Sequence, residues 1–71
     1  MYENLRKMRV ELNVPVLELS QLLDLKTIAA YYKKENGTVK FSLVEAKKIA
    51  DRMDKSIEEV FFKDELAEMQ K

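Results

Sequence analysis

The sequence contains no cysteine and no histidine, and it has only one glycine and one proline. Without cysteine the chain can form neither a disulfide nor a thiolate metal site, and a reducing compartment is compatible with it. Without histidine it lacks the commonest metal ligand and the commonest general base. We therefore expect no metal, no cofactor and no catalytic residues, that is, a binding protein and not an enzyme.

Long hydrophobic runs are also missing. No apolar run approaches the roughly 18 residues of a membrane span, and no apolar stretch of a signal peptide follows the first residues. We expect a cytoplasmic protein, in a bacterial host cell, with no membrane partner. The 71 residues, 46% hydrophobic and 37% charged, have the composition of a folded chain and fit a single domain, residues 1–71.

The charges sum to zero but are unevenly placed. The middle of the chain, residues 26–40, carries four lysines and a single acidic residue, Glu35. Residues 57–71 carry five acidic residues and two lysines. This pattern predicts a polar molecule whose basic side suits an anionic partner.

Hydrophobic spacing predicts five short helices. The first covers residues 3–12 and stops at Asn13, a residue type that tolerates the left-handed conformation. The second begins at about Pro15 and ends at Asp24, because proline is favoured in a first helical turn. The third covers residues 27–35, with Thr27 as the N-cap.

Capping boxes mark the start of the last two helices. Ser42 is followed three residues later by Glu45, and Ser56 is followed in the same way by Glu59. Gly37 closes the third helix with a positive φ, and residues 38–41 are expected to form a loop. The expected core consists of Leu5, Met8, Leu12, Leu19, Leu23, Leu25, Tyr31, Leu43, Ala46, Ile49, Ala50, Met53, Ile57, Val60 and Phe61.

The order of these elements carries a resemblance. Three features occur together: the motif Leu5-Arg6-x-x-Arg9, the short helix after Pro15, and the string Tyr31-Tyr32-Lys33-Lys34-Glu35-Asn36-Gly37-Thr38-Val39-Lys40-Phe41-Ser42. This combination resembles the Cro/CI-type helix-turn-helix family of phage regulators. The resemblance covers residues 4–61 and leaves residues 62–71 as a C-terminal extension. It implies an all-α, five-helix lambda-repressor-like domain with residues 27–36 as the recognition helix, which this family places in the major groove. Glu35 resembles the family glutamate that holds the loop after that helix.

Two functions follow from the resemblance and stay open. The first is a transcriptional regulator of a lysogeny/lysis switch that binds operator DNA. The second is an antirepressor that binds the DNA-binding domain of a CI-type repressor, as in temperate lactococcal phages. Val16, Asp24 and the turn Ile28-Ala29-Ala30 depart from the family pattern toward the second, because aliphatic side chains cannot read a donor–acceptor pattern.

Both functions require the same surface. Tyr31 is assigned to the core and Tyr32 to the surface, because neighbouring residues cannot share one helix face. Phe62, Leu66 and Met69 follow helical spacing and are candidates for a homodimer contact. The candidate DNA- or partner-binding residues are Val16, Lys26, Thr27, Ile28, Ala30, Tyr32, Lys33, Lys34, Asn36 and Lys40.

Overall fold

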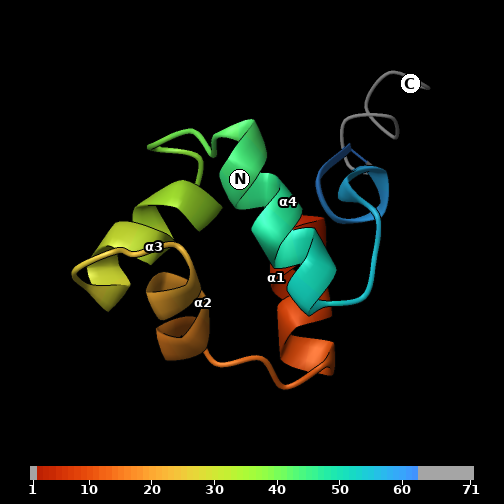
Figure 1. Ribbon diagram of the computed structural model, residues 1–71, viewed down its shortest axis with the longest axis horizontal. Coiled ribbons are helices and arrows are strands. Elements are labelled where there is room, and N and C mark those ends of the chain that lie inside the picture. The colour runs from red at the N-terminus through yellow and green to blue at the C-terminus, as the bar shows by residue number, and fades with distance from the viewer. Residues whose placement is uncertain (1, 63–71) are drawn as a thin grey trace.

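A computed structural model describes residues 2–62, and this part of the chain is helical and without strands (Figure 1). The predicted all-α class and the predicted number of helices are confirmed. In chain order the elements are α1 (Glu3–Glu11), α2 (Val16–Leu22), α3 (Ile28–Glu35), α4 (Leu43–Arg52) and η1 (Glu58–Phe62).

The structure confirms the predicted helix starts. The Thr27 hydroxyl accepts a hydrogen bond from the Ala30 N–H at 3.1 Å, as an N-cap does. At α4 the Ser42 hydroxyl accepts from the Glu45 N–H at 3.1 Å, and the Glu45 carboxylate accepts from the Ser42 N–H at 2.9 Å. The same reciprocal pair joins Ser56 and Glu59, so both capping boxes are confirmed. The helix after the second box, η1, has π geometry and not the expected α geometry.

The helix ends explain how a chain with one glycine makes its turns. Positive φ values occur at Asn13 (56°), Asp24 (57°), Asp54 (56°) and Gly37 (88°). Asparagine and aspartate tolerate this region because their short polar side chains can hydrogen-bond locally. After α1 the Val14 N–H donates to the Arg9 carbonyl at 2.9 Å, which is the long hydrogen bond of a Schellman motif. The predicted ends at Asn13, Asp24 and Gly37 are therefore confirmed.

The hydrophobic core joins all five elements. The predicted core is wrong at Leu12 and Leu43, which are exposed, and it omitted Val14 and Val16, which are buried. Leu12 is the C-cap of α1 and Leu43 is the first residue of α4. The buried apolar residues are Leu5, Val14, Val16, Leu19, Leu23, Tyr31, Ala46, Ile49, Ala50, Met53, Val60 and Phe61.

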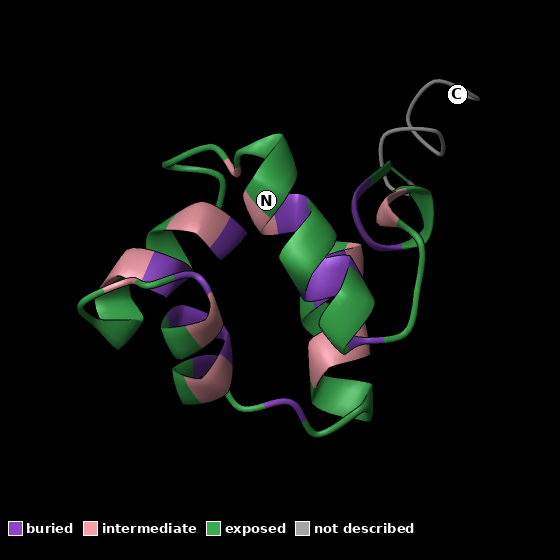
Figure 2. Cartoon of the chain, viewed as in Figure 1, coloured by how far each residue is buried: buried purple, intermediate pink, exposed green. Residues whose placement is uncertain are grey.

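The helices pack with their buried sides toward one another (Figure 2). α2 packs against α3 and also contacts α4, and α1 contacts both α3 and η1. Within residues 2–62 none of the helices combines the length and the apolar character that crossing a bilayer requires. In the same part of the chain no three acidic side chains come together as a metal site would need.

Candidate contact surface on helix α3

The inner side of α3 is held to α1 by a buried ion pair. The Arg9 guanidinium donates to both carboxylate oxygens of Glu35, with N–O distances of 3.0 and 3.1 Å. These hydrogen bonds outweigh the opposing desolvation and raise the pKa of Arg9 above its ordinary value. Tyr31 lies one helical turn before Glu35 on the same side of α3 and is fully buried. Burial raises the pKa of its phenol.

Glu35 also receives a backbone contact, because the Tyr2 N–H donates to its carbonyl at 3.0 Å. Both the side chain and the main chain of Glu35 therefore hold the N-terminal helix. The expectation that Glu35 holds the loop after α3 is wrong, because both of its carboxylate oxygens accept hydrogen bonds from Arg9 of α1.

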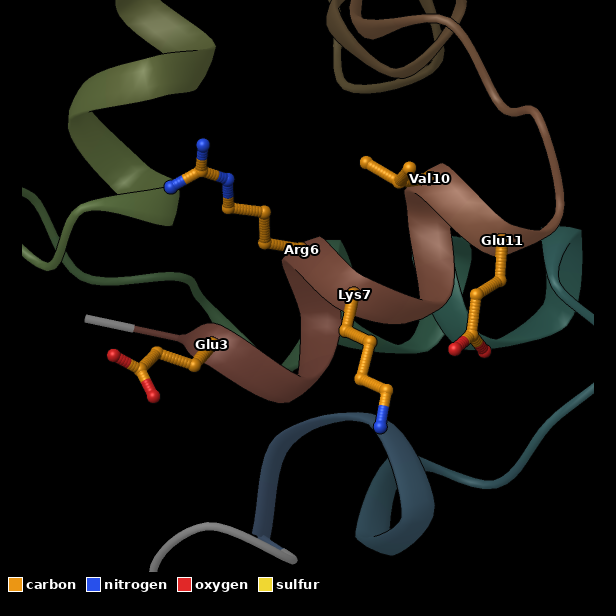
Figure 3. A pocket seen from close by; sticks show the side chains of 5 residues that line it. All are labelled: Glu3, Arg6, Lys7, Val10 and Glu11. Atoms are coloured by element: carbon orange, nitrogen blue, oxygen red, sulfur yellow. The ribbon is translucent and has the colours of Figure 1, made fainter.

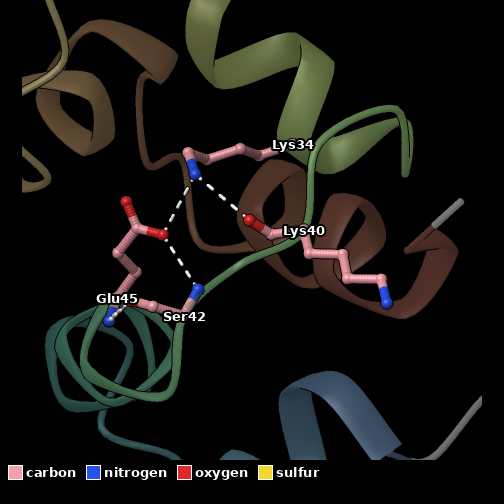
Figure 4. Close-up of polar contacts among 4 residues, drawn as sticks. All are labelled: Lys34, Lys40, Ser42 and Glu45. Atoms are coloured by element: carbon pink, nitrogen blue, oxygen red, sulfur yellow. Dashed lines mark hydrogen bonds and ion pairs between the residues drawn. The ribbon is translucent and has the colours of Figure 1, made fainter.

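Lys34 holds that loop instead (Figure 4). Its ammonium donates to the Lys40 carbonyl at 3.2 Å and to the Glu45 carboxylate at 3.0 Å, and it lies 5.9 Å from the centre of the Phe41 ring. Only 12% of its side chain is exposed. The prediction that Lys34 contacts DNA or a partner is therefore wrong, because its charge and its donors are used inside the protein.

The carboxylate of Glu45 is shared between two elements. Desolvation alone would raise its pKa, but the hydrogen bonds from the Ser42 N–H and from Lys34 lower that pKa below its ordinary value of 4.5. One carboxylate thus caps α4 and binds the lysine of α3. This arrangement ties the C-terminal turn of α3 to the start of α4.

The outer side of α3 is exposed. Ile28, Ala29, Tyr32, Lys33 and Asn36 are all exposed. Residues 28, 32 and 36 form one row at a spacing of four, residues 29 and 33 form the row beside it, and together the two rows make one broad exposed side of the helix. We call these five residues the α3 outer face. Its first turn is apolar, with Ile28 43% exposed, and its last turn is polar. Tyr31 in the core and Tyr32 on the surface, 44% exposed, are as predicted.

The remaining predicted residues divide into three groups. Lys26, Thr27 and Lys40 are exposed beside α3, and within residues 2–62 Lys26, Lys33 and Lys40 form no ion pair. Ala30 is half-buried, so Ala29 takes the place predicted for it. Val16 is buried, which corrects the prediction that its side chain contacts a ligand. Pro15, with extended backbone, directly precedes it as the N-cap of α2.

The three residues predicted for a dimer contact lie at the C-terminal end of the chain. Phe62 is the last residue of η1 and is exposed, while Leu66 and Met69 lie outside the described residues.

Two hollows adjoin α1. A polar hollow of about 210 Å³ lies between α1 and α3 and is lined by Arg6, Arg9, Tyr32, Glu35 and Asn36. Sequence reasoning missed Arg6 as part of this surface, although its place in the Leu5-Arg6-x-x-Arg9 motif could have indicated it.

A shallower hollow of about 490 Å³ follows the exposed side of α1. Figure 3 shows that its charged side chains point in different directions, with Arg6 and Lys7 diverging. In the smaller hollow the Glu35 carboxylate is already paired with Arg9.

Comparison of the chain with protein-family models, with curated proteins and with solved structures finds no match.

Proposed function

We propose that this chain is a helix-turn-helix protein of a phage genetic switch that acts as an antirepressor. In this proposal the α3 outer face docks on the DNA-binding domain of a CI-type repressor and blocks its hold on the operator. The helix-turn-helix would be α2 and α3, which pack on each other and are joined by residues 23–27.

The observation that carries the proposal is the apolar first turn of α3. Ile28 and Ala29 occupy its first two positions and are both exposed. In a DNA-reading helix these positions meet base edges, where an aliphatic side chain can touch a thymine methyl but cannot donate or accept. Exposed apolar side chains beside an exposed tyrosine are instead typical of a protein contact.

Electrostatics supports the same proposal. The chain has no net charge, and Asp24 is exposed in the turn between α2 and α3. Lys34, one of the four lysines of the basic segment, is withdrawn into the fold. Direct DNA binding depends chiefly on lysine and arginine contacts to phosphate. Because Lys34 is used inside the protein, three of the four lysines of residues 26–40 remain available for such contacts.

One observation favours the second candidate, direct binding of operator DNA. Lys26, Lys33 and Lys40 are exposed around α3, and Asn36 adds a hydrogen-bonding side chain. These groups could contact phosphates and position the domain on a duplex.

The decisive experiment mixes the pure 71-residue chain with the DNA-binding domain of a CI-type phage repressor and measures binding by calorimetry and size exclusion. We expect one shared complex, and we expect Ile28→Glu to weaken it by about tenfold or more. Leu17→Glu is the matched control, because Leu17 is 53% exposed in the first turn of α2 but lies outside the α3 outer face. Separate elution of the two proteins would reject the antirepressor function.

A gel-shift experiment tests the second candidate. Retention of operator DNA by this chain alone, weakening steeply as salt rises, would establish DNA binding in place of repressor binding. In that case Lys33→Met should lower the salt slope by about one, as expected for a lost phosphate contact. Absence of retention at low salt leaves the antirepressor function as proposed.

A further inference from the structure

An arginine of α1 lies beside the α3 outer face without a counterion. Arg6 is exposed, and within residues 2–62 it takes part in no ion pair. Its side chain points toward α3, whereas the side chain of its neighbour Lys7 points toward η1 (Figure 3). Arg6 therefore adds a positive charge next to the surface that we propose for the partner.

The polar hollow between α1 and α3 connects Arg6 to that surface. Tyr32 and Asn36, two of the five residues of the α3 outer face, line the hollow together with Arg6, Arg9 and Glu35. Its volume is about 210 Å³. Sites for whole small molecules have roughly 300–1,000 Å³, so this hollow suits a single side chain better.

The walls of the hollow are fixed before any ligand arrives. Arg9 and Glu35 are joined by two hydrogen bonds, and Glu35 is only 2% exposed. The Tyr2 N–H donates to the Glu35 carbonyl at 3.0 Å, which ties the start of α1 to the end of α3. A preformed site loses less conformational freedom on binding than a mobile one, so less of the binding energy is spent on ordering it.

The charges around the hollow favour a group with one negative charge. Arg9 and Glu35 neutralise each other, so the uncompensated charge of the lining is that of Arg6. The Tyr32 hydroxyl and the Asn36 amide add neutral hydrogen-bond donors. A doubly charged group is disfavoured, because it would be repelled by the Glu35 carboxylate at short range.

The neighbouring apolar turn indicates where this negative charge comes from. Ile28, Tyr32 and Asn36 form one row along α3, and its ends are about 12 Å apart along the helix axis. An aliphatic side chain, a tyrosine and an arginine in one patch are typical of the centre of a protein–protein interface. In such an interface the monoanion is an aspartate or glutamate side chain, which a guanidinium binds through two parallel hydrogen bonds.

We propose that Arg6 and the hollow between α1 and α3 bind a carboxylate side chain of the protein partner. The partner would present this acidic residue about 12 Å from the apolar residue that meets Ile28, a distance of about two turns on a helix. The identity of the partner rests on the proposed function, whereas the carboxylate site rests on the lining of the hollow. Arg6 is then a residue that selects the partner, because a protein without an acidic group at this place leaves it unpaired.

The site is tested first without a partner. Sodium acetate is titrated into the 71-residue chain against sodium chloride at constant ionic strength, and NMR follows the Arg6 Nε–H and the Asn36 side-chain amide. We expect saturable shifts of both signals with acetate and none with chloride. Arg6→Gln should abolish the Asn36 shift. Lys7→Gln is the matched control, because Lys7 is the next residue of α1, is also exposed and carries the same charge.

Two results of this titration would overturn the site. One is the absence of a saturable acetate shift, and the other is an equal response of the Asn36 signal in the Arg6→Gln and Lys7→Gln variants. Both variants should unfold at the temperature of the unsubstituted chain, because both positions are exposed.

The contact with the partner is tested with the repressor domain. By calorimetry, Arg6→Gln should weaken the complex by about tenfold or more and Lys7→Gln by less than about twofold. Equal weakening would mean that only net charge matters, which overturns the carboxylate contact and leaves the proposed function standing. If the unsubstituted chain does not bind the repressor domain, the proposed function is rejected, and the acetate titration still decides on the site.

Operator DNA gives the last arm of the test. If the chain retains DNA in a gel shift and Arg6→Gln lowers the salt slope by about one, the ligand of Arg6 is a phosphate. That result would overturn the assignment to a carboxylate of a protein partner.

Discussion

Lys33 and Lys34 are neighbours in α3 and carry the same charge, yet they lie in different environments. Lys33 is exposed on the α3 outer face, and Lys34 is held between the Lys40 carbonyl and Glu45. The same contrast separates Tyr32 from Tyr31 and Asn36 from Glu35. The inner side of α3 uses its charges in contacts within the protein, and the outer side leaves its side chains exposed. Substitutions on the inner side of α3 should therefore cost more stability than substitutions on its outer side.

The largest effect is expected from the inner side of α3, at the buried ion pair. Arg9→Met should lower the free energy of unfolding by about 3–5 kcal/mol, because it leaves the buried Glu35 carboxylate unpaired. Urea denaturation followed by circular dichroism measures the change. The double variant Arg9→Met with Glu35→Met should recover most of the stability, since it buries no charge. A double variant as unstable as the single one would mean that the charge is not the cause.

The neighbouring residues Lys33 and Lys34 should differ in their effect on the free energy of unfolding. Lys34→Met should lower the free energy of unfolding by about 1–2 kcal/mol, because it removes two hydrogen bonds from a charged donor. Lys33→Met should change it by less than about 0.5 kcal/mol. Equal effects of the two substitutions would contradict the division between the sides of α3.

The loss in Lys34→Met should also depend on pH. Because the pKa of Glu45 is lowered in the folded state, its stabilisation is complete above the ordinary value of 4.5 and is lost as the pH falls below it. Lys34→Met removes one cause of that lowered pKa. The stability difference between the two proteins should therefore be constant near neutral pH and should shrink below pH 4.5.

The smallest effect on stability is expected on the outer side. Ile28→Ser removes an exposed side chain from the first turn of α3, so the free energy of unfolding should change by less than about 0.5 kcal/mol. The same substitution should weaken partner binding, because it removes apolar contact area. Thermal unfolding and calorimetry of one preparation measure both. A large loss of stability would show that Ile28 is part of the core.

Much of the fold could be predicted from local patterns. Thr27, Ser42 and Glu45 mark helix starts through hydrogen bonds that span three residues, so their partners lie in the same stretch of sequence. Asn13 and Gly37 mark helix ends for the same reason. The placing of Tyr31 inside and Tyr32 outside needed only the helical period.

The candidate site could be predicted only in part. The pattern placed Ile28, Tyr32 and Lys33 on the correct side of α3, because exposure there follows the helical period. It could not show that Lys34 is unavailable, since its carboxylate partner lies 11 residues away in another helix.

The sequence by itself therefore determined where the helices start and end and which side of each is apolar, because these depend on contacts between near neighbours. Only the tertiary structure decided which charges stay available and which apolar residues stay exposed. Val16 is buried and Leu43 is exposed once the helices have packed, and Arg9 meets Glu35 across 26 residues of chain. Those outcomes depend on long-range packing, which no local pattern contains.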